Sequence, residues 1–322
     1  MGTARLDDPE LHSLVESRLT QDFHQRVAIC ISIFCPDGPL LDALLAAIDP
    51  TFPIILHIDG PTGVAIEDGQ LAALAAVGRY RLLQAPGNRG IGAALNRMVE
   101  EARELGCEWI LFFDQDSEPP PEMARELLKA FVGLEDAGQQ PAVVGPTPIA
   151  GEGQNSKPPS YRVRAHGSPS ERYRPIDYVI TSGSLIRLSA FAEIGLFREE
   201  YRMDAIDTEW CFRAWARGYS VWHVRDVEMR HRVGEGVVQL GRVRFPRQSR
   251  SRMRSYVRNQ FHLLRLGHVP WRWKLRTVVY VPCQVAVFIA RSPGQRIRFA
   301  GQMLNAIWDG LTARFDHPPD RG

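Results

Sequence analysis

The sequence predicts an α/β protein whose mostly parallel sheet is covered by helices on both faces, followed by a helical extension. Short continuous apolar runs alternate with helix-length segments along the first half of the chain, and the pattern turns helical from about residue 250. Strands that alternate with helices of ten or more residues are typical of βαβ units. The 322 residues are 44% hydrophobic, which suffices for a substantial core.

Residues 27–34 form a continuous apolar run with β-branched residues, as in a strand buried on both faces. The other strands of the first half are expected at residues 54–58, 80–84 and 109–113. The intervening helices are expected at residues 39–48, 70–77 and 91–105. Together these segments predict the parallel part of the sheet.

The second half has weaker signals. Residues 146–176 are rich in Gly, Pro and Ser and are expected to form a long loop. Short strands are expected after it, at residues 178–180, 184–186, 220–223 and 227–229. A helix is expected to begin near Asp207 as N-cap and to end at Gly218. We divide the chain into a lead-in (1–26), a catalytic domain (27–235) and a basic helical extension (236–322).

Charge is divided unequally along the chain. After Glu235 there are sixteen Lys or Arg against three acids, about +13, and the preceding residues carry about −11. A basic segment of this size favours an anionic partner such as an acidic membrane surface or a lipid-borne diphosphate. No nucleic-acid module is recognisable, so nucleic-acid binding is not expected.

The cysteines and apolar segments favour a cytoplasmic location. The five cysteines contain no CxxC pair, which is typical of a reducing compartment rather than of a disulfide framework. The longest apolar run, residues 277–290, contains Pro282 and Gln284 and is too short for a bilayer core of ~30 Å. Aromatic residues between the arginines of the extension favour contact with the inner face of the plasma membrane. The alternative is an extension packed on the catalytic domain with a solvated arginine face.

Two carboxylates, Asp114 and Asp116, follow the expected strand at 109–113. Ligands of parallel α/β sheets bind at the carboxyl ends of strands, and hard oxygen ligands suit Mg²⁺ or Mn²⁺. The pair therefore predicts a divalent cation that bridges diphosphate oxygens. The alternative is a solvated turn in which Asp114 caps the following helix.

Several further blocks occur with this acidic pair in a fixed order. They are Gly87–Asn96 (GNRGIGAALN), Phe113–Ser117 (FDQDS), Thr181–Ser184, Gly195–Phe197, Asp204–Ala214, Gly218–Tyr219, His231–Gly234 and Tyr256–Asn259. In this order the blocks resemble family 2 of the inverting glycosyltransferases, which share the GT-A fold. Within that family the DQDS form of the acidic motif is similar to the bacterial rhamnosyltransferase branch.

The resemblance implies a set of residues that bind the nucleotide-sugar donor. They are Asp59 beside the nucleobase, Asn88, Gly90, Gly92 and Asn96 under the nucleotide and sugar, Gln115 within the acidic motif, and Ser182 and Gly183 near the sugar. For Asp59 the alternative is a turn residue before Gly60. The glycines at 90 and 92 are expected to permit close backbone approach.

The resemblance also implies the metal and catalytic residues. Asp114 and Asp116 would hold the cation together with His231, for which a purely structural role is the alternative. Asp207 would be the general base, with a helix cap as its alternative role, and Asp204 its substitute, since Ile206 replaces the first acid of the family's Glu-Asp pair. Glu209 is a further candidate to supply the negative charge of the acid that Ile206 replaces. Arg213 is expected to orient acids or phosphate, with a surface residue as the alternative.

The expected activity is transfer of a hexose with inversion, with dTDP-L-rhamnose as donor and a glycan or lipid-linked acceptor in cell-surface glycan biosynthesis. A UDP-sugar donor is the alternative within the same fold. A haloacid-dehalogenase-like phosphatase is an alternative of another class, because Asp114 and Asp116 have the spacing of its nucleophile and acid. A non-enzymatic scaffold that binds lipid or nucleic acid through the extension is the third.

Overall fold

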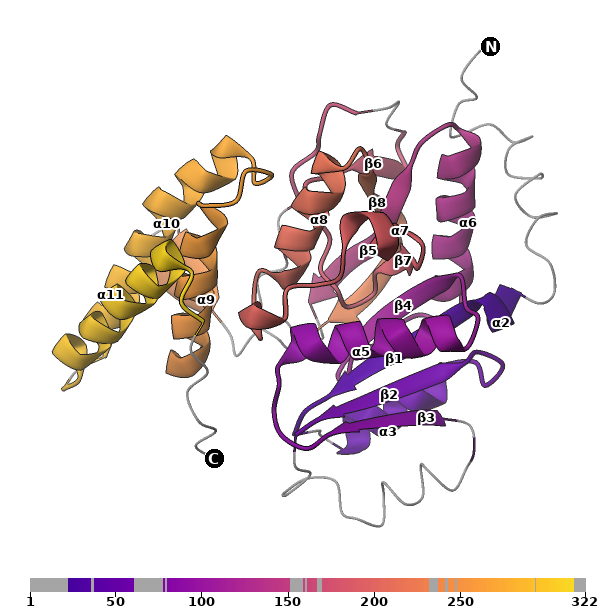
Figure 1. The fold of residues 1–322 in the computed structure, drawn as a ribbon, viewed down its shortest axis with the longest axis horizontal. Helices are drawn as coiled ribbons and strands as arrows, with labels where there is room; N and C mark the ends of the chain where they lie inside the picture. Colours follow the sequence, from indigo (N-terminus) through magenta and orange to yellow (C-terminus); the bar gives the residue numbers. More distant parts are fainter. Residues whose placement is uncertain are drawn as a thin grey trace.

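The computed structural model describes residues 23–35, 38–60, 78, 80–150, 159, 161–166, 170–231, 237–240, 243–246, 248–292 and 294–315. The helix expected at residues 70–77 lies outside these residues. The described chain forms a large sheet flanked by helices, with a bundle of three long helices beside it (Figure 1).

The sheet has eight strands in the order β3-β2-β1-β4-β7-β5-β8-β6. β1 pairs in parallel with β2 and β4, β2 pairs in parallel with β3, and β5 pairs in parallel with β8, whereas β7 and β6 run antiparallel to their neighbours. The mostly parallel sheet is therefore confirmed. The strands are β1 (Val27–Ile33), β2 (Ile54–Asp59), β3 (Tyr80–Ala85), β4 (Trp109–Asp114), β5 (Pro141–Ala150), β6 (Tyr173–Pro175), β7 (Leu185–Arg187) and β8 (Ser220–His231).

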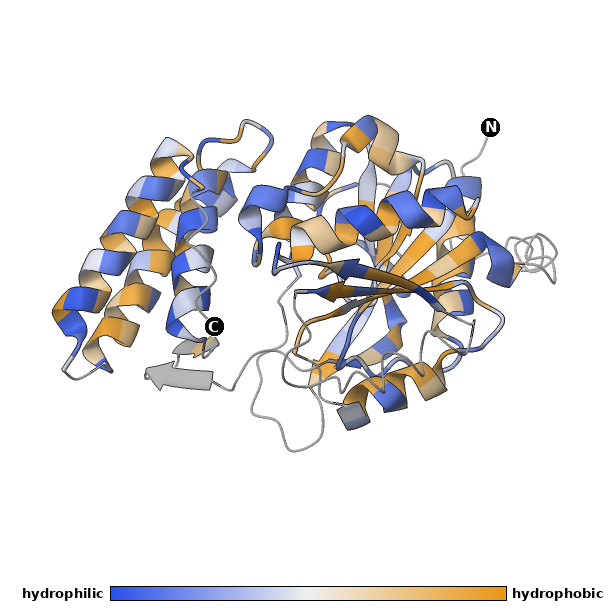
Figure 2. Cartoon of the chain, turned by 60° about the horizontal axis from the view of Figure 1, so that its bottom comes forward, coloured by the Kyte–Doolittle hydropathy of each residue, from blue (hydrophilic) through white to orange (hydrophobic). Residues whose placement is uncertain are grey.

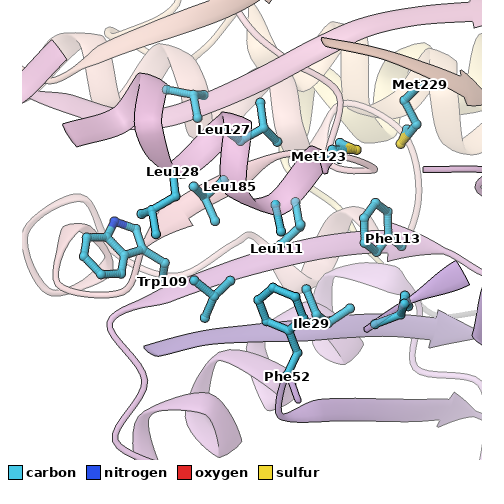
Figure 3. Close-up of a cluster of buried hydrophobic side chains, with 14 of the residues drawn as sticks. Ile29, Phe52, Trp109, Leu111, Phe113, Met123, Leu127, Leu128, Leu185 and Met229 are labelled. Atoms are coloured by element: carbon cyan, nitrogen blue, oxygen red, sulfur yellow. The ribbon is translucent and has the colours of Figure 1, made fainter. Parts of the chain in front are cut away.

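Helices cover both faces of this sheet, as expected. They are α2 (Phe23–Arg26), α3 (Gly38–Ala47), α5 (Ile91–Glu104), α6 (Met123–Asp136), α7 (Ala190–Ile194), the 3-10 turn η1 (Glu199–Tyr201) and α8 (Ile206–Ala216). Along β1, Ile29 and Ile31 belong to the apolar cluster with α3 and α6 shown in Figure 3, and Ala28 and Cys30 to the cluster with α5 and α8. Burial on both faces explains the unbroken apolar run of this strand.

The extension folds as expected into helices, preceded by a hairpin of β9 (Val237–Leu240) and β10 (Val243–Pro246). The helices are α9 (Arg250–Leu263), α10 (Trp271–Ala290) and α11 (Arg296–Thr312). Ser249 caps α9, because its hydroxyl accepts a hydrogen bond from the Arg252 amide. Met253, Val281 and Phe299 are part of a separate apolar core of the bundle, whose helices carry the orange stripes of Figure 2.

Four local expectations need correction. Residues 178–180 form no strand, β5 extends to Ala150 into the expected loop, and β8 is one strand instead of two. Asp207 is not the N-cap of α8: Ala205 holds that position in a left-handed conformation, and Asp207 lies in the first turn. Gly218, with a φ of +86°, follows the C-cap Arg217 as expected.

Candidate active site

The main cavity, of about 710 Å³, lies between the catalytic sheet and the helical extension. The catalytic part contributes the end of β4 and the segments at residues 177–182 and 203–208, and the extension contributes α9 and α10. Among the acids expected to act, Asp114, Asp204 and Asp207 all line it. The structure therefore brings the base candidates and one metal candidate to one cavity.

Asp207 has the properties of a general base. Burial raises the pKa of its carboxyl to about 6, hydrogen bonds from the Thr208 amide and hydroxyl oppose the rise, and the charges of Asp204 and Asp114 add to it. A base works best when its pKa lies near the working pH, because it is then ionised and still basic enough to take a proton. Asp207 meets both conditions near neutral pH.

Asp204 is held differently. Its Oδ1 pairs with the Arg252 guanidinium at 3.0 Å, and its Oδ2 is buried without a hydrogen-bond partner in the described part of the chain. Burial raises the pKa of this carboxyl, although Arg252 opposes the rise. Asp207 has no basic partner among the described residues, so its lone pairs are more available for an acceptor hydroxyl.

The loop before α8 is strained, and α9 holds it in place. Arg202, Asp204 and Ala205 all have positive φ angles, a conformation that costs non-glycine residues free energy and that clusters at functional sites. The Asn259 amide of α9 donates to the carbonyl oxygens of Tyr201, Met203 and Asp204 at 2.7–3.0 Å. The extension therefore fixes the backbone that carries both base candidates.

The acidic motif after β4 is a turn pinned from two sides. Ser182 Oγ accepts from the Asp114 amide and lies 2.7 Å from Ser117 Oγ. The Gln115 side chain bonds the Phe34 backbone, accepting from its amide and donating to its carbonyl. Gln115 and Ser182 thus shape the turn in this structure, and Ser182 also lines the cavity. Their contact with the donor stays a prediction.

The two motif acids suit a cation shared with a ligand. Asp116 is half-buried and makes no hydrogen bond or ion pair within the described chain, and it lines a neighbouring hollow rather than the main cavity. No group of three His, Cys, Asp or Glu residues converges among the described residues. Mg²⁺ commonly binds through one or two carboxylates and completes its shell with substrate phosphate and water, so Asp114 and Asp116 fit such an ion. His231 ends β8, and its side chain lies outside the described residues.

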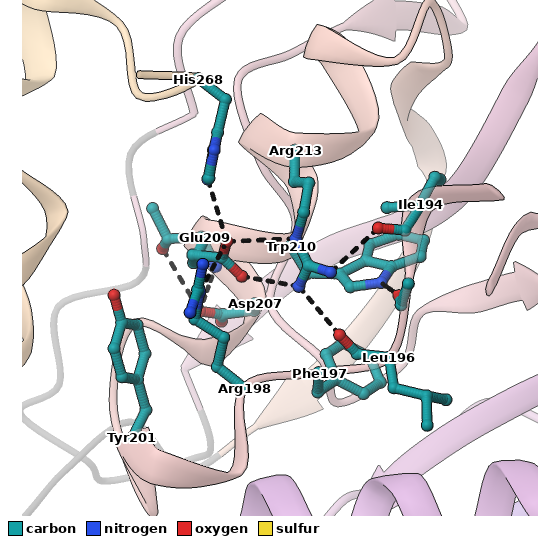
Figure 4. Close-up of polar contacts among 12 residues, drawn as sticks. Ile194, Leu196, Phe197, Arg198, Tyr201, Asp207, Glu209, Trp210, Arg213 and His268 are labelled. Carbon is teal, nitrogen blue, oxygen red and sulfur yellow. Dashed lines mark hydrogen bonds and ion pairs between the residues drawn. The ribbon is translucent and has the colours of Figure 1, made fainter. Parts of the chain in front are cut away.

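Glu209 and Arg213 form a buried network that holds α8 in place, shown in Figure 4. The Glu209 carboxylate is fully buried and lies within 3.1 Å of His268, Arg213 and Arg198. Burial opposes its ionisation, but the His268 and Arg213 contacts outweigh burial and lower its pKa to about 2. Arg213 also donates to the carbonyl oxygens of Ile194 and Leu196. Neither side chain lines the cavity, and a role of the two residues in positioning Asp207 stays a prediction.

The segment around Asp59 and Asn88, which is predicted to bind the donor, is held by hydrogen bonds within the protein. Both Asp59 carboxylate oxygens accept backbone hydrogen bonds, from the Arg89 amide at 2.7 Å and the Gly90 amide at 2.8 Å. The Arg202 guanidinium donates to the Asn88 backbone and side-chain oxygens. Asp59 and Asn88 therefore shape the loop, and their contacts with a nucleotide stay predictions.

The remaining donor candidates also pack against protein. The buried Asn96 amide bonds the Phe197 backbone in both directions, tying α5 to the segment before η1. A Cβ on Gly92 would lie 2.8 Å from the Arg198 carbonyl oxygen, and one on Gly183 would lie 2.9 Å from Met229 and Pro146. The close approach that these glycines permit is, in this structure, an approach of the chain to itself.

Gly90 gives a stability prediction. Its φ is +90°, and an added Cβ would lie 2.6 Å from Arg202 Cα, so Gly90→Ala combines backbone strain with overpacking. We expect it to destabilise the protein by about 2–4 kcal/mol in urea denaturation. Gly106→Ala is the matched control, since Gly106 has a φ of +74° but no atom within 4 Å of its Cβ. Equal losses in the two variants would rule out the packing argument.

Sequence reasoning missed the cavity residues of the extension. They are Gln248, Arg252, Tyr256, Gln260, Pro270, Arg272, Trp273, Arg276, Tyr280 and Gln284. The available signal was the helical spacing of Trp273, Arg276, Tyr280 and Gln284, which puts polar and aromatic side chains on one face of an otherwise apolar helix. Read alone, that spacing does not say what the face contacts.

Comparisons with known proteins agree with this geometry. Residues 39–195 match the family model described as Glycosyl transferase family 2. The dTDP-rhamnosyl transferase RfbF of Shigella flexneri is 28% identical over 287 residues, which cover 87% of this chain and 94% of that protein. These matches support a sugar transferase over the phosphatase and scaffold alternatives.

Solved structures share the fold. The mannosyltransferase PcManGT from Pyrobaculum calidifontis, in complex with GDP-Man and Mn²⁺, aligns with a TM-score of 0.52 at 12% identity, over 94% of this chain and 99% of its own. GalNAc-T7 with UDP, GalNAc and Mn²⁺ aligns with the same TM-score and identity over 91% of this chain, which spans 58% of that longer one. The chain therefore has the GT-A fold, and the sequence matches support its assignment to glycosyl transferase family 2, with similarity to a dTDP-rhamnosyl transferase.

Proposed function

We propose that the protein transfers L-rhamnose from dTDP-L-rhamnose, with inversion, to a hydroxyl of a glycan or lipid-linked acceptor. The observation that carries the proposal is the single cavity that holds Asp207, a carboxylate with a pKa of about 6, together with Asp114 at the end of β4. The similarity to RfbF supports the choice of donor. The catalytic unit is residues 27–235, and the extension 236–322 completes its cavity.

In the proposed mechanism Asp207 accepts the proton of the acceptor hydroxyl as its oxygen attacks the anomeric carbon. The bond from that carbon to the nucleotide diphosphate breaks on the opposite face, so one displacement inverts the anomeric centre. A Mg²⁺ or Mn²⁺ ion held by Asp114 and Asp116, with His231 as third candidate ligand, would supply Lewis-acid stabilisation of the leaving diphosphate. Asp204 is ion-paired with Arg252, so Asp207 is the carboxylate that acts as the base.

A thermal-shift comparison of nucleotide sugars tests the donor. A ligand that binds only the native state stabilises it by about 2.7 kcal/mol at a hundred times its dissociation constant. We expect dTDP-L-rhamnose with Mn²⁺ to raise the melting temperature more than UDP-glucose or GDP-mannose with Mn²⁺, and more than either component alone. A larger shift with UDP-glucose would replace the proposed donor, and no shift with any of the three would contradict donor binding.

We further propose that the enzyme works at the cytoplasmic face of the plasma membrane, bound through α10 and α11. In the described chain α10 alone is long and apolar enough to cross a membrane. It also carries cavity-lining arginines, which favours a helix lying at the interface over one that spans the bilayer. Large apolar side chains on the exposed surface of the two helices are Trp271, Leu275, Val278, Val279, Ile297, Leu304, Trp308 and Leu311.

Vesicle binding tests this surface. Leu275→Glu with Leu304→Glu should reduce co-sedimentation with phosphatidylglycerol vesicles several-fold, because each change places a charge against lipid. Leu105→Glu is the control, since Leu105 is exposed on the catalytic domain at the end of α5. Unchanged binding of the double variant would contradict the proposed surface.

A further inference from the structure

Helix α10 has two opposite faces that differ in chemistry. Trp273, Arg276, Tyr280 and Gln284 line the active-site cavity, together with Arg272. Trp271, Leu275, Val278 and Val279 are more than half exposed on the other side of the helix. The helical period of 3.6 residues separates the two sets by about half a turn. One helix therefore lies between the catalytic cavity and an apolar outer surface.

Among the residues that the structure describes, the arginines on this helix have no acidic partners. No described carboxylate lies within ion-pair distance of Arg272 or Arg276, whereas Arg252 in the same cavity is paired with Asp204. The Arg276 guanidinium lies 4.9 Å from the Trp273 ring centre and 4.8 Å from that of Tyr280, and Arg272 lies 5.3 Å from Trp271. An arginine stacked on aromatic rings has few accessible orientations and keeps its N–H groups available for an anion.

These cations come from a different part of the chain than the motif proposed to serve the donor. Asp114 ends β4 in the catalytic domain, whereas both arginines belong to α10 of the extension, which contributes its own share of the cavity lining. A donor has one diphosphate, which a cation at the motif would already neutralise. The unpaired arginines therefore fit a second anionic group, brought by the acceptor.

We propose that Arg272 and Arg276 bind a phosphate or diphosphate carried by the acceptor, and that this acceptor ends in a hydrocarbon chain lying toward the apolar face of α10. The inference rests on the proposed function, since it assigns the acceptor class for the same cavity. Planar guanidinium groups bind phosphate oxygens in pairs, and the adjoining Trp271 and Leu275 offer an apolar surface to the chain. The acceptor is thus a lipid-linked phosphate.

Farnesyl diphosphate is a suitable probe, with inorganic pyrophosphate and farnesol as its two halves. Titration calorimetry without Mn²⁺ or nucleotide sugar should show that farnesyl diphosphate binds more tightly than either half. Arg272→Gln with Arg276→Gln should weaken this binding by about tenfold or more, because charge-assisted hydrogen bonds are lost. Arg296→Gln with Arg298→Gln removes the same charge from α11 and should leave the binding unchanged.

The donor supplies the deciding control. The Arg272→Gln, Arg276→Gln variant should keep the Mn²⁺-dependent thermal shift with dTDP-L-rhamnose, which also shows that it is folded. If that shift falls in parallel with farnesyl diphosphate binding, the arginines serve the donor and the inference is wrong. Pyrophosphate or farnesol binding as tightly as the whole probe, or an equal loss in the α11 variant, would also overturn it. Failure of the wild type to bind any nucleotide sugar would instead contradict the proposed function.

Discussion

Replacement of Asp207 by Asn is expected to abolish transfer while it raises the melting temperature. The loss of a general base costs about 10²–10⁴-fold in kcat. The gain in stability arises because burial raises the Asp207 pKa from 3.8 to about 6. Above pH 6 the native state holds an ionised carboxylate that the unfolded state ionises more easily, so neutral Asn recovers about 2–3 kcal/mol. Steady-state kinetics and thermal unfolding at pH 7.5 measure both effects.

The same pKa predicts how the wild type depends on pH. The base must be ionised, so kcat/KM should fall about tenfold per pH unit below pH 6. The contribution of this carboxyl to the free energy of unfolding changes in the opposite direction to the activity. Between pH 6 and 4 the native carboxyl takes up a proton before the unfolded one does, so the stability penalty of burying its charge shrinks as the pH falls. Asp204→Asn serves as the comparison. If it abolishes transfer and Asp207→Asn does not, the two roles are exchanged.

Replacement of Asp116 by Asn is expected to remove metal-dependent donor binding. A carboxylate that holds the cation on the leaving diphosphate contributes several kcal/mol to the transition state, which corresponds to about a hundredfold or more in rate. The Mn²⁺-dependent part of the thermal shift with dTDP-L-rhamnose should vanish as well. In the wild type, a chelator should abolish activity, and added Mn²⁺ or Mg²⁺ should restore it.

Glu118→Gln is the matched control for this variant. Glu118 lies two residues further along the same turn, exposed, and also borders the hollow beside Asp116. We expect it to retain the metal-dependent shift. Equal loss in both variants would mean that overall negative charge near β4, and not ligation by Asp116, attracts the cation.

The parallel half of the sheet was predictable because its information is local. The runs that became β1, β2 and β4 need no partner to be recognised, since each is a mainly apolar run that is buried on both faces. β5 was missed because Pro141, Pro146 and Pro148 indicate a loop. The structure accommodates these prolines in a strand whose pairing with β8 shifts register twice, between Pro141 and Val143 and between Gly145 and Thr147.

For the polar residues, the sequence likewise predicted what depends on local position and missed what depends on distant partners. Asp114 and Asp207 were predicted as site residues, and both line the cavity. Glu209 and Arg213 were expected there too, but their nearest partners are His268, Arg198 and backbone carbonyls behind α8. A buried carboxylate that is fully paired cannot be told from a catalytic one by sequence spacing, because the partners come from distant segments.

By itself, the sequence determined the alternation of strands and helices in the first half, the acids at the end of β4 and the presence of an acid near the start of α8, since each depends on residues a few positions apart. Only the tertiary structure decided that the basic extension completes the active-site cavity and that Asn259 holds the loop before α8. These contacts join segments more than fifty residues apart. They depend on how whole elements pack, which no local pattern encodes.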